Sequence, residues 1–234
     1  MATSPSNADL PRALWLWALP VPLIAHLCAR QFDPQDVIFS RWIESEAGLI
    51  ENATALLLLP AAYFAFVVGL RCYRRFGPML CVWFMCVAGL CFGFAGEEIS
   101  WGQHWLGWQS PEYFIEHNRQ GETNFHNVNI HFGRVVKSIL TLAIIVGGII
   151  MPLRRVKRAY RHEFWAIATP TLVCVPAAIF VFGIRLVERF KTWFDIEWGL
   201  LAVNLKESQE LYIAIFLLLY SWSAYCRFAS NRNT

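Results

Sequence analysis

Charged side chains are scarce in this sequence. Asp, Glu, Lys and Arg make up 16% of its 234 residues, whereas a soluble domain carries about 25%. Apolar residues make up 56%, so the composition excludes an ordinary soluble domain and indicates a membrane protein. The net charge is only +3, and we therefore expect no nucleic-acid partner.

Disulfide and metal motifs are also lacking. None of the seven cysteines forms a CxxC pair, and we expect them to pack as small hydrophobic side chains within helices. No HExxH motif is present, so no strong zinc signal exists. The sequence also has no repeat, low-complexity tract or separate soluble domain. We therefore expect a single domain.

Long apolar runs are what the sequence does contain. A helix of about 17–25 residues crosses a hydrocarbon core, and it satisfies its backbone polar groups without water. We therefore predict an all-α, polytopic integral membrane protein, a bundle of six transmembrane helices. The six predicted spans cover about 13–29, 50–70, 78–96, 135–153, 164–187 and 210–226.

The predicted transmembrane domain covers residues 13–227. It lies between a disordered cytoplasmic tail, 1–12, and a short cytoplasmic tail, 228–234. A cleaved signal peptide is the competing interpretation of the first apolar run.

The charges between the runs are segregated by sign. All 17 acidic residues except Asp9 and Glu163 fall in the segments 30–52, 97–133 and 188–210. Lys and Arg in short loops mark the cytoplasmic side, so both termini are predicted to be cytoplasmic. The acidic loops then face the periplasm or exterior of a cell inner (plasma) membrane. The cations that define this orientation are Arg12, Arg71, Arg74, Arg75, Arg154, Arg155, Lys157, Arg158, Arg161, Arg227 and Arg232.

The longest acidic segment, 97–133, concentrates the chemistry. It holds four of the six histidines, namely His104, His117, His126 and His131. If the third helix continued past Gly96, then Glu97, Trp101 and His104 would share one helical face. A carboxylate and an imidazole on one face can bind a metal ion or exchange protons.

Three groups of candidate residues follow from this pattern. The catalytic candidates are Glu97, Glu98, His104, His126 and Asn127, and the substrate-binding candidates are Glu51, Arg134, Arg185 and Trp101. His126, His131 and Glu98 are candidate ligands of a divalent metal such as zinc or calcium. Plainer alternatives stay open, in which the carboxylates are solvated at the interface, Arg185 neutralises a carboxylate and Trp101 joins an aromatic belt.

The stretches GEEISWGQ and QGETNFHN resemble a signature of a family of bacterial polytopic membrane proteins. The resemblance implies a defining site but no reaction. That site comprises Glu97, Glu98, Trp101, Gln103, Glu122, Asn124, His126 and Asn127. The segment WIESEAGLIENAT is more faintly similar to alkaline-ceramidase-type membrane hydrolases, which have seven spans and a histidine pair in the last span. The likeness of EEISWG to the EExxxR motif of glutamate-type intramembrane proteases lacks the arginine.

Two functions agree with these observations. The first is a hydrolase or transferase with a Glu/His site at the outer membrane face, acting on a lipid or lipid-linked substrate and metal-dependent if the histidines are ligands. The alternative is a non-enzymatic membrane component, either a small transporter or an accessory subunit with a membrane protein partner. In both cases membrane lipids surround the protein.

Overall fold

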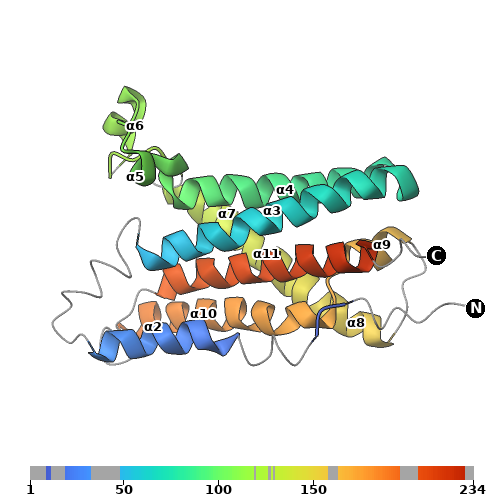
Figure 1. Ribbon diagram of the computed structural model, residues 1–234. Helices are drawn as coiled ribbons and strands as arrows, with labels where there is room; N and C mark the ends of the chain where they lie inside the picture. The colour runs from blue at the N-terminus through green and yellow to red at the C-terminus, as the bar shows by residue number, and fades with distance from the viewer. Residues whose placement is uncertain are drawn as a thin grey trace, which may run out of the picture.

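The computed structural model describes residues 9–11, 19–32, 48–118, 120–125, 128, 130–157, 163–195 and 205–229. These residues form helices and no strand, as the apolar runs predict (Figure 1). The main helices are α2 (Pro20–Phe32), α3 (Leu49–Phe76), α4 (Pro78–Glu98), α7 (Ile130–Ile145), α10 (Val175–Phe194) and α11 (Leu205–Ala229). The shorter ones are η3 (Ser100–Gly102), α5 (Gln103–Leu106), α6 (Glu112–His117), η4 (Val146–Ile150), α8 (Met151–Lys157), α9 (Glu163–Ala168) and η5 (Leu172–Cys174).

Within the described ranges, four helical segments are long and apolar enough to cross a membrane. They are Leu49–Tyr73, Pro78–Glu98, Val135–Arg155 and Phe164–Phe194. They correspond to the second to fifth predicted spans. The first predicted span, 13–29, begins outside the described residues, and its described part falls in the shorter apolar helix Pro20–Ala29. The sixth predicted span, 210–226, lies inside α11.

Helices α3 and α4 form a long antiparallel pair joined by one residue, Gly77. Gly77 has φ of 84°, a left-handed conformation that glycine adopts without the steric cost of a Cβ. Pro78 then begins α4, where its missing N–H costs no helical hydrogen bond. This Gly-Pro pair reverses the chain sharply and lays the two helices side by side.

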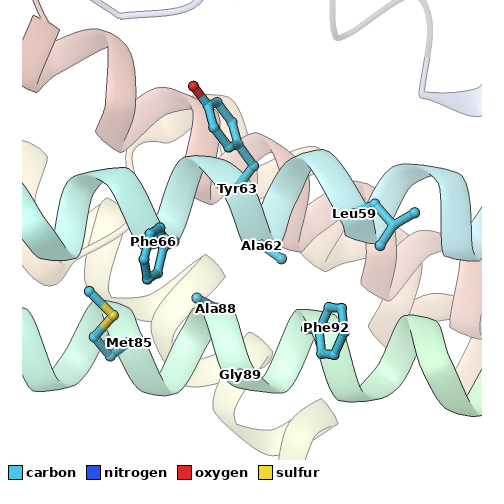
Figure 2. Close-up of a pocket in the computed structure, with 8 residues that line it drawn as sticks. All are labelled: Leu59, Ala62, Tyr63, Phe66, Met85, Ala88, Gly89 and Phe92. Carbon is cyan, nitrogen blue, oxygen red and sulfur yellow. The ribbon is translucent and has the colours of Figure 1, made fainter.

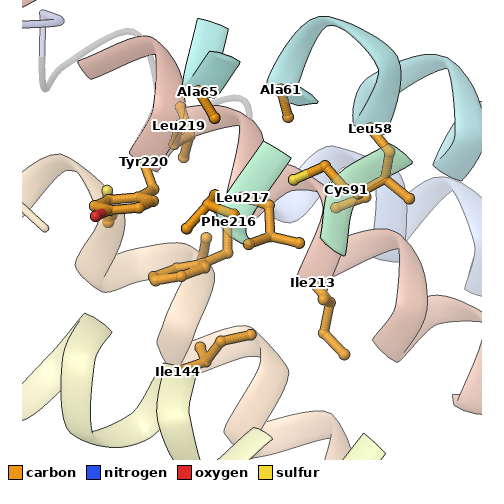
Figure 3. Packing of buried hydrophobic residues seen from close by; sticks show 14 of the residues in the cluster. Leu58, Ala61, Ala65, Cys91, Ile144, Ile213, Phe216, Leu217, Leu219 and Tyr220 are labelled. Atoms are coloured by element: carbon orange, nitrogen blue, oxygen red, sulfur yellow. The ribbon is translucent and has the colours of Figure 1, made fainter. Parts of the chain in front are cut away.

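Helix α11 lies at the centre of the packing and contacts both α3 and α10. Most of its side chains are buried around the whole circumference, as expected for a helix enclosed by others. Figure 3 shows its residues Ile213, Phe216 and Tyr220 among side chains of α3, α4 and α7. The helix is therefore shielded by its neighbours along most of its length.

Two of the predicted spans are not regular α-helices throughout. Between α7 and α8 the chain forms a π-helical segment, Val146–Ile150, where Gly148 contacts α10 and α11 closely. The fifth span breaks between Ala168 and Val175 and then continues to Phe194. Pro170 explains the break, because proline lacks an N–H and disfavours helical geometry in the residue before it.

An apolar groove runs along α3 and α4 (Figure 2). Its lining includes no carboxylate and no imidazole, and its one titratable side chain is Tyr63. Its lining residues are Leu59, Ala62, Tyr63, Phe66, Met85, Ala88, Gly89 and Phe92.

Candidate functional site

The predicted chemistry gathers at one end of the helical bundle. Helix α4 ends there, α3 and α11 begin there, and α5 and α6 project beyond it (Figure 1). Two groups of polar side chains lie in this region. We call them the acidic cluster, which surrounds Glu98, and the loop network, which surrounds Glu122.

The acidic cluster brings together carboxylates from α3, α4 and α11. Glu98 is only 9% exposed. The nearby negative charges of Glu51, Glu207 and Glu210 disfavour the ionised form of Glu98. The positive charge of Lys137 in α7 favours the ionised form of Glu98. The Nζ of Lys137 also donates a hydrogen bond to Oε1 of Glu210. Three carboxylates thus lie near Glu98, and one of them, Glu210, is paired with Lys137.

Polar contacts continue from this cluster along α11. Gln209 is fully buried, and its Nε2 lies 3.4 Å from Oγ1 of Thr141 in α7. His26 of α2 is also buried, with Nδ1 2.6 Å from Oγ of Ser208. The first turns of α11 are therefore tied by side-chain hydrogen bonds to α7 and α2.

Helix α4 does not continue to His104, so the shared helical face predicted for Glu97, Trp101 and His104 does not form. The helix ends at Glu98, and Ser100 and Trp101 have φ of 45° and 55°. Such left-handed geometry is sterically costly for residues with a Cβ. It turns the Trp101 ring back over Gly96, where an added Cβ would lie 2.9 Å from ring atoms.

Glu97 holds this reversed chain through both of its oxygens. Trp101 Nε1 donates to Oε1 at 3.0 Å, and the backbone N–H of Phe125 donates to Oε2 at 2.7 Å. Glu97 therefore joins the GEEISWGQ and QGETNFHN stretches, through a hydrogen bond to Phe125, 28 residues away.

The loop network is built on Glu122. Its Oε2 accepts hydrogen bonds from Ser100 Oγ at 2.7 Å and from Asn124 Nδ2 at 3.0 Å. Its Oε1 lies 2.8 Å from Nε2 of His104. Asn118 Nδ2 adds a bond of 2.8 Å to Oδ1 of Asn124. The carboxylate lies between serine and histidine, so His104 does not contact Ser100 as the base of a nucleophilic serine would.

Gln103 and Trp105 complete the attachment of the loop. Gln103 Oε1 accepts from the N–H of Thr123 at 2.9 Å and from Ser110 Oγ at 3.1 Å. Trp105 Nε1 donates to Oδ1 of Asn52 at 2.9 Å, which fastens the loop to the first turn of α3. The described residues of the GEEISWGQ and QGETNFHN stretches therefore fold into one hydrogen-bonded loop at the end of the bundle.

The remaining predicted residues either lie outside the acidic cluster or fall outside the described part of the chain. Arg185 lies on α10 and its Nη2 is 3.4 Å from Ser138 Oγ, while Trp101 is 41% exposed at the loop surface. His126 and Asn127 lie outside the described residues. His131 and Arg134 belong to α7, but their side chains lie outside the described part.

Within the described part of the chain, no three His, Cys, Asp or Glu side chains are arranged to hold a metal ion. The predicted ligand set of His126, His131 and Glu98 has only the Glu98 side chain in that part. All seven cysteines are free thiols. Cys72, Cys91 and Cys174 are buried, as expected for small packing side chains, whereas Cys28 and Cys86 are exposed.

The residues that complete the acidic cluster did not enter the predicted site. Lys137, Glu207 and Glu210 stand near the start of apolar runs, where a charged residue is ordinarily an interfacial anchor. Two signals single out the two glutamates. Glu207 and Glu210 lie in the segment 188–210, which charge segregation predicts on the same side as Glu51 and Glu98. They are also three apart, which places them on one face of α11.

The fold and this site define an all-α protein with helices long and apolar enough to cross a membrane and a carboxylate-rich end. No family model, no curated protein and no solved structure matches the chain.

Proposed function

We propose that this chain is a six-span inner-membrane enzyme, with cytoplasmic termini, that acts on a lipid or lipid-linked substrate at the outer face. The reaction is a hydrolysis or a group transfer. The observation that carries the proposal is the buried Glu98 with Glu51, Glu207 and Glu210 near it, and with Lys137 paired to Glu210. Ionisable side chains at the edge of an apolar bundle are costly to bury and mark functional sites.

Glu98 is the group proposed to move the proton. It is buried, it is surrounded by other carboxylates, and it ends the helix that reaches the site. A general base of this kind would take a proton from water or from an acceptor hydroxyl as that oxygen attacks an ester. Lys137 would then stabilise negative charge that develops on the ester oxygen. As the ester C–O bond breaks, protonated Glu98 would return its proton to the leaving alkoxide, which departs as an alcohol.

Glu97 and His104 receive different roles in this proposal. Both Glu97 oxygens accept hydrogen bonds from the loop, and His104 is paired with Glu122. These residues position the loop over Glu98. A divalent metal held by His126, His131 and Glu98 remains a prediction and has no step in this mechanism.

The apolar middle of helix α11 favours an enzyme over a small transporter. A transporter of protons or ions needs polar groups across the hydrocarbon core. The middle of α11, Ile213–Leu219, consists entirely of apolar residues, and it occupies the centre of the bundle. The polar residues of this helix lie nearer its two ends.

Activity can be tested with the purified full-length protein in lipid nanodiscs. A panel of labelled glycerolipids, sphingolipids and lipid-linked sugars would be incubated with it and the products identified by mass spectrometry. We expect turnover of one substrate class, and a fall of about 100-fold or more in Glu98→Gln, the scale of a lost general base. Glu112→Gln, an exposed carboxylate on α6, is the matched control and should keep full activity.

Equal activity in Glu98→Gln and the wild type would reject Glu98 as the base. If no class is turned over, the accessory-subunit alternative becomes the better account, and crosslinking in native membranes should then capture a stoichiometric membrane protein. The proposed orientation is tested separately by the accessibility of single cysteines placed at Arg154 and Glu112. The first should react only from the cytoplasmic side and the second only from outside.

A further inference from the structure

Two arginines lie at the end of the bundle away from the acidic cluster. Arg155 is on α8 and Arg227 is in the last turn of α11. Figure 1 shows α8 and the end of α11 at the opposite end of the bundle from α5 and α6. The two side chains are close enough for the positive charge of Arg155 to disfavour the charged form of Arg227. Burial of Arg227 disfavours the same charged form.

Among the described residues, neither guanidinium group forms an ion pair, which would need a carboxylate oxygen within 4.0 Å of its nitrogens. Nη1 of Arg155 and Nη2 of Arg227 are buried and have no hydrogen-bond partner there. The Nε of Arg227 donates to the backbone oxygen of Ser223 at 3.3 Å. A buried cation with unused donors is unfavourable unless an anion approaches it.

The carboxylate of Asp9 favours the charged form of Arg227. Its Oδ1 already accepts hydrogen bonds from Ser223 Oγ at 2.6 Å and from the N–H of Leu10 at 2.8 Å. Asp9 is one carboxylate against two guanidinium groups, so one positive charge remains in excess among Asp9, Arg155 and Arg227.

Hydroxyl groups border the same region. Thr171 Oγ1 lies 3.2 Å from Ser223 Oγ, and Thr169 is 1% exposed with an Oγ1 that has no partner among the described residues. Both belong to the break between α9 and α10. Arginine forks with neighbouring hydroxyls are the donors that recognise a phosphate group.

We propose that Arg155 and Arg227 bind a phosphate group at this end of the bundle. The phosphate belongs either to the headgroup of an anionic lipid or to a small soluble phosphate. The candidate span Val135–Arg155 ends at one of the two arginines. This site is separate from the proposed enzymatic site, and binding there needs no turnover.

Thermal unfolding of the purified full-length protein in dodecyl maltoside tests the proposal. One arm adds sodium phosphate, against sodium chloride at equal ionic strength. The other adds phosphatidylglycerol, against phosphatidylcholine. We expect a saturable rise in the unfolding midpoint with at least one phosphate probe beyond its control. In Arg155→Gln the apparent affinity should fall about tenfold or more, the loss expected for a charge-assisted hydrogen bond.

The neighbouring Arg154 is exposed on the same helix, so Arg154→Gln is the matched control and should bind as the wild type does. Arg227→Lys keeps the charge but loses the planar fork, and it should also bind more weakly. A rise with inorganic phosphate identifies a small phosphate ligand, whereas a rise with phosphatidylglycerol alone identifies a lipid headgroup. The proposal is overturned if neither probe raises the midpoint, or if Arg154→Gln weakens binding as much as Arg155→Gln. Glu98→Gln should leave the rise unchanged, so this result and the enzymatic result are independent.

Discussion

The indole N–H of Trp101 donates to Oε1 of Glu97 at 3.0 Å, although Trp101 lies beyond the end of α4 in a left-handed conformation. The two residues are four apart and would also be neighbours on a continuous helix. They meet instead because the backbone turns back on itself after the end of α4. That reversal brings Ser100 to Glu122 and closes the loop over the end of the bundle.

Replacing Gly96 with alanine should disturb this loop. The new Cβ would lie 2.9 Å from Cε3 and Cζ3 of Trp101, so the indole ring must move away from Glu97. We expect a loss of about 1–3 kcal/mol in the free energy of unfolding, typical of overpacking. Gly93→Ala on the same helix is the control, because its added Cβ meets no atom within 4 Å. Equal stability of the two variants would contradict the observed position of the ring.

Replacing Glu122 with alanine should loosen the same loop from its other side. Ser100 and Asn124 are buried and would both lose an acceptor, at a cost of about 1–3 kcal/mol for stranded polar groups. Faster cleavage within 103–125 during limited proteolysis would report the change. Glu116→Ala, an exposed carboxylate on α6, should leave the cleavage rate near that of the wild type. A rate in Glu122→Ala no faster than in this control would argue against the network.

Replacing Lys137 with methionine should destabilise the acidic cluster. Glu210 and Glu98 would lose their cation while the carboxylates remain together. The Lys137 and Glu210 side chains are 28% and 19% exposed, so we expect a loss of about 1–3 kcal/mol rather than the larger cost of breaking a fully buried pair. Thermal unfolding in detergent measures it. The double variant Lys137→Met/Glu210→Gln should recover part of the loss, and additive effects of the two substitutions would refute their coupling.

Replacing Gly148 with alanine should open the packing of α7–α8 on α10 and α11. The added Cβ would lie 2.5 Å from Cε2 of Phe216 and 2.8 Å from Cβ of Ala178, so the helices must separate, at about 1–3 kcal/mol. Gly147→Ala is an adjacent control with no atom within 4 Å, and it should be neutral or stabilising by up to about 1 kcal/mol. Unfolding midpoints of both variants provide the comparison, and the reverse order of stability would invalidate the close packing at the π-helical segment.

The sequence by itself determined the helical class and the position of the apolar runs. These features are local, because apolar composition over about 20 residues acts within one segment. It also separated acidic from basic segments, which is a property of the loops alone.

Only the tertiary structure decided which side chains meet. Local periodicity carries no information on contacts between distant segments, so it did not predict that Lys137 would join Glu210 and Glu98 or that Glu122 would hold Ser100 and His104. The predicted third span ends at 96, two residues before the observed end of α4 at Glu98. The left-handed turn at Ser100 and Trp101 was hidden, since contacts with residues 122–125 hold it. Hydropathy could not show that α11 is enclosed by other helices, because lipid chains and apolar side chains are equally favourable surroundings for such a helix.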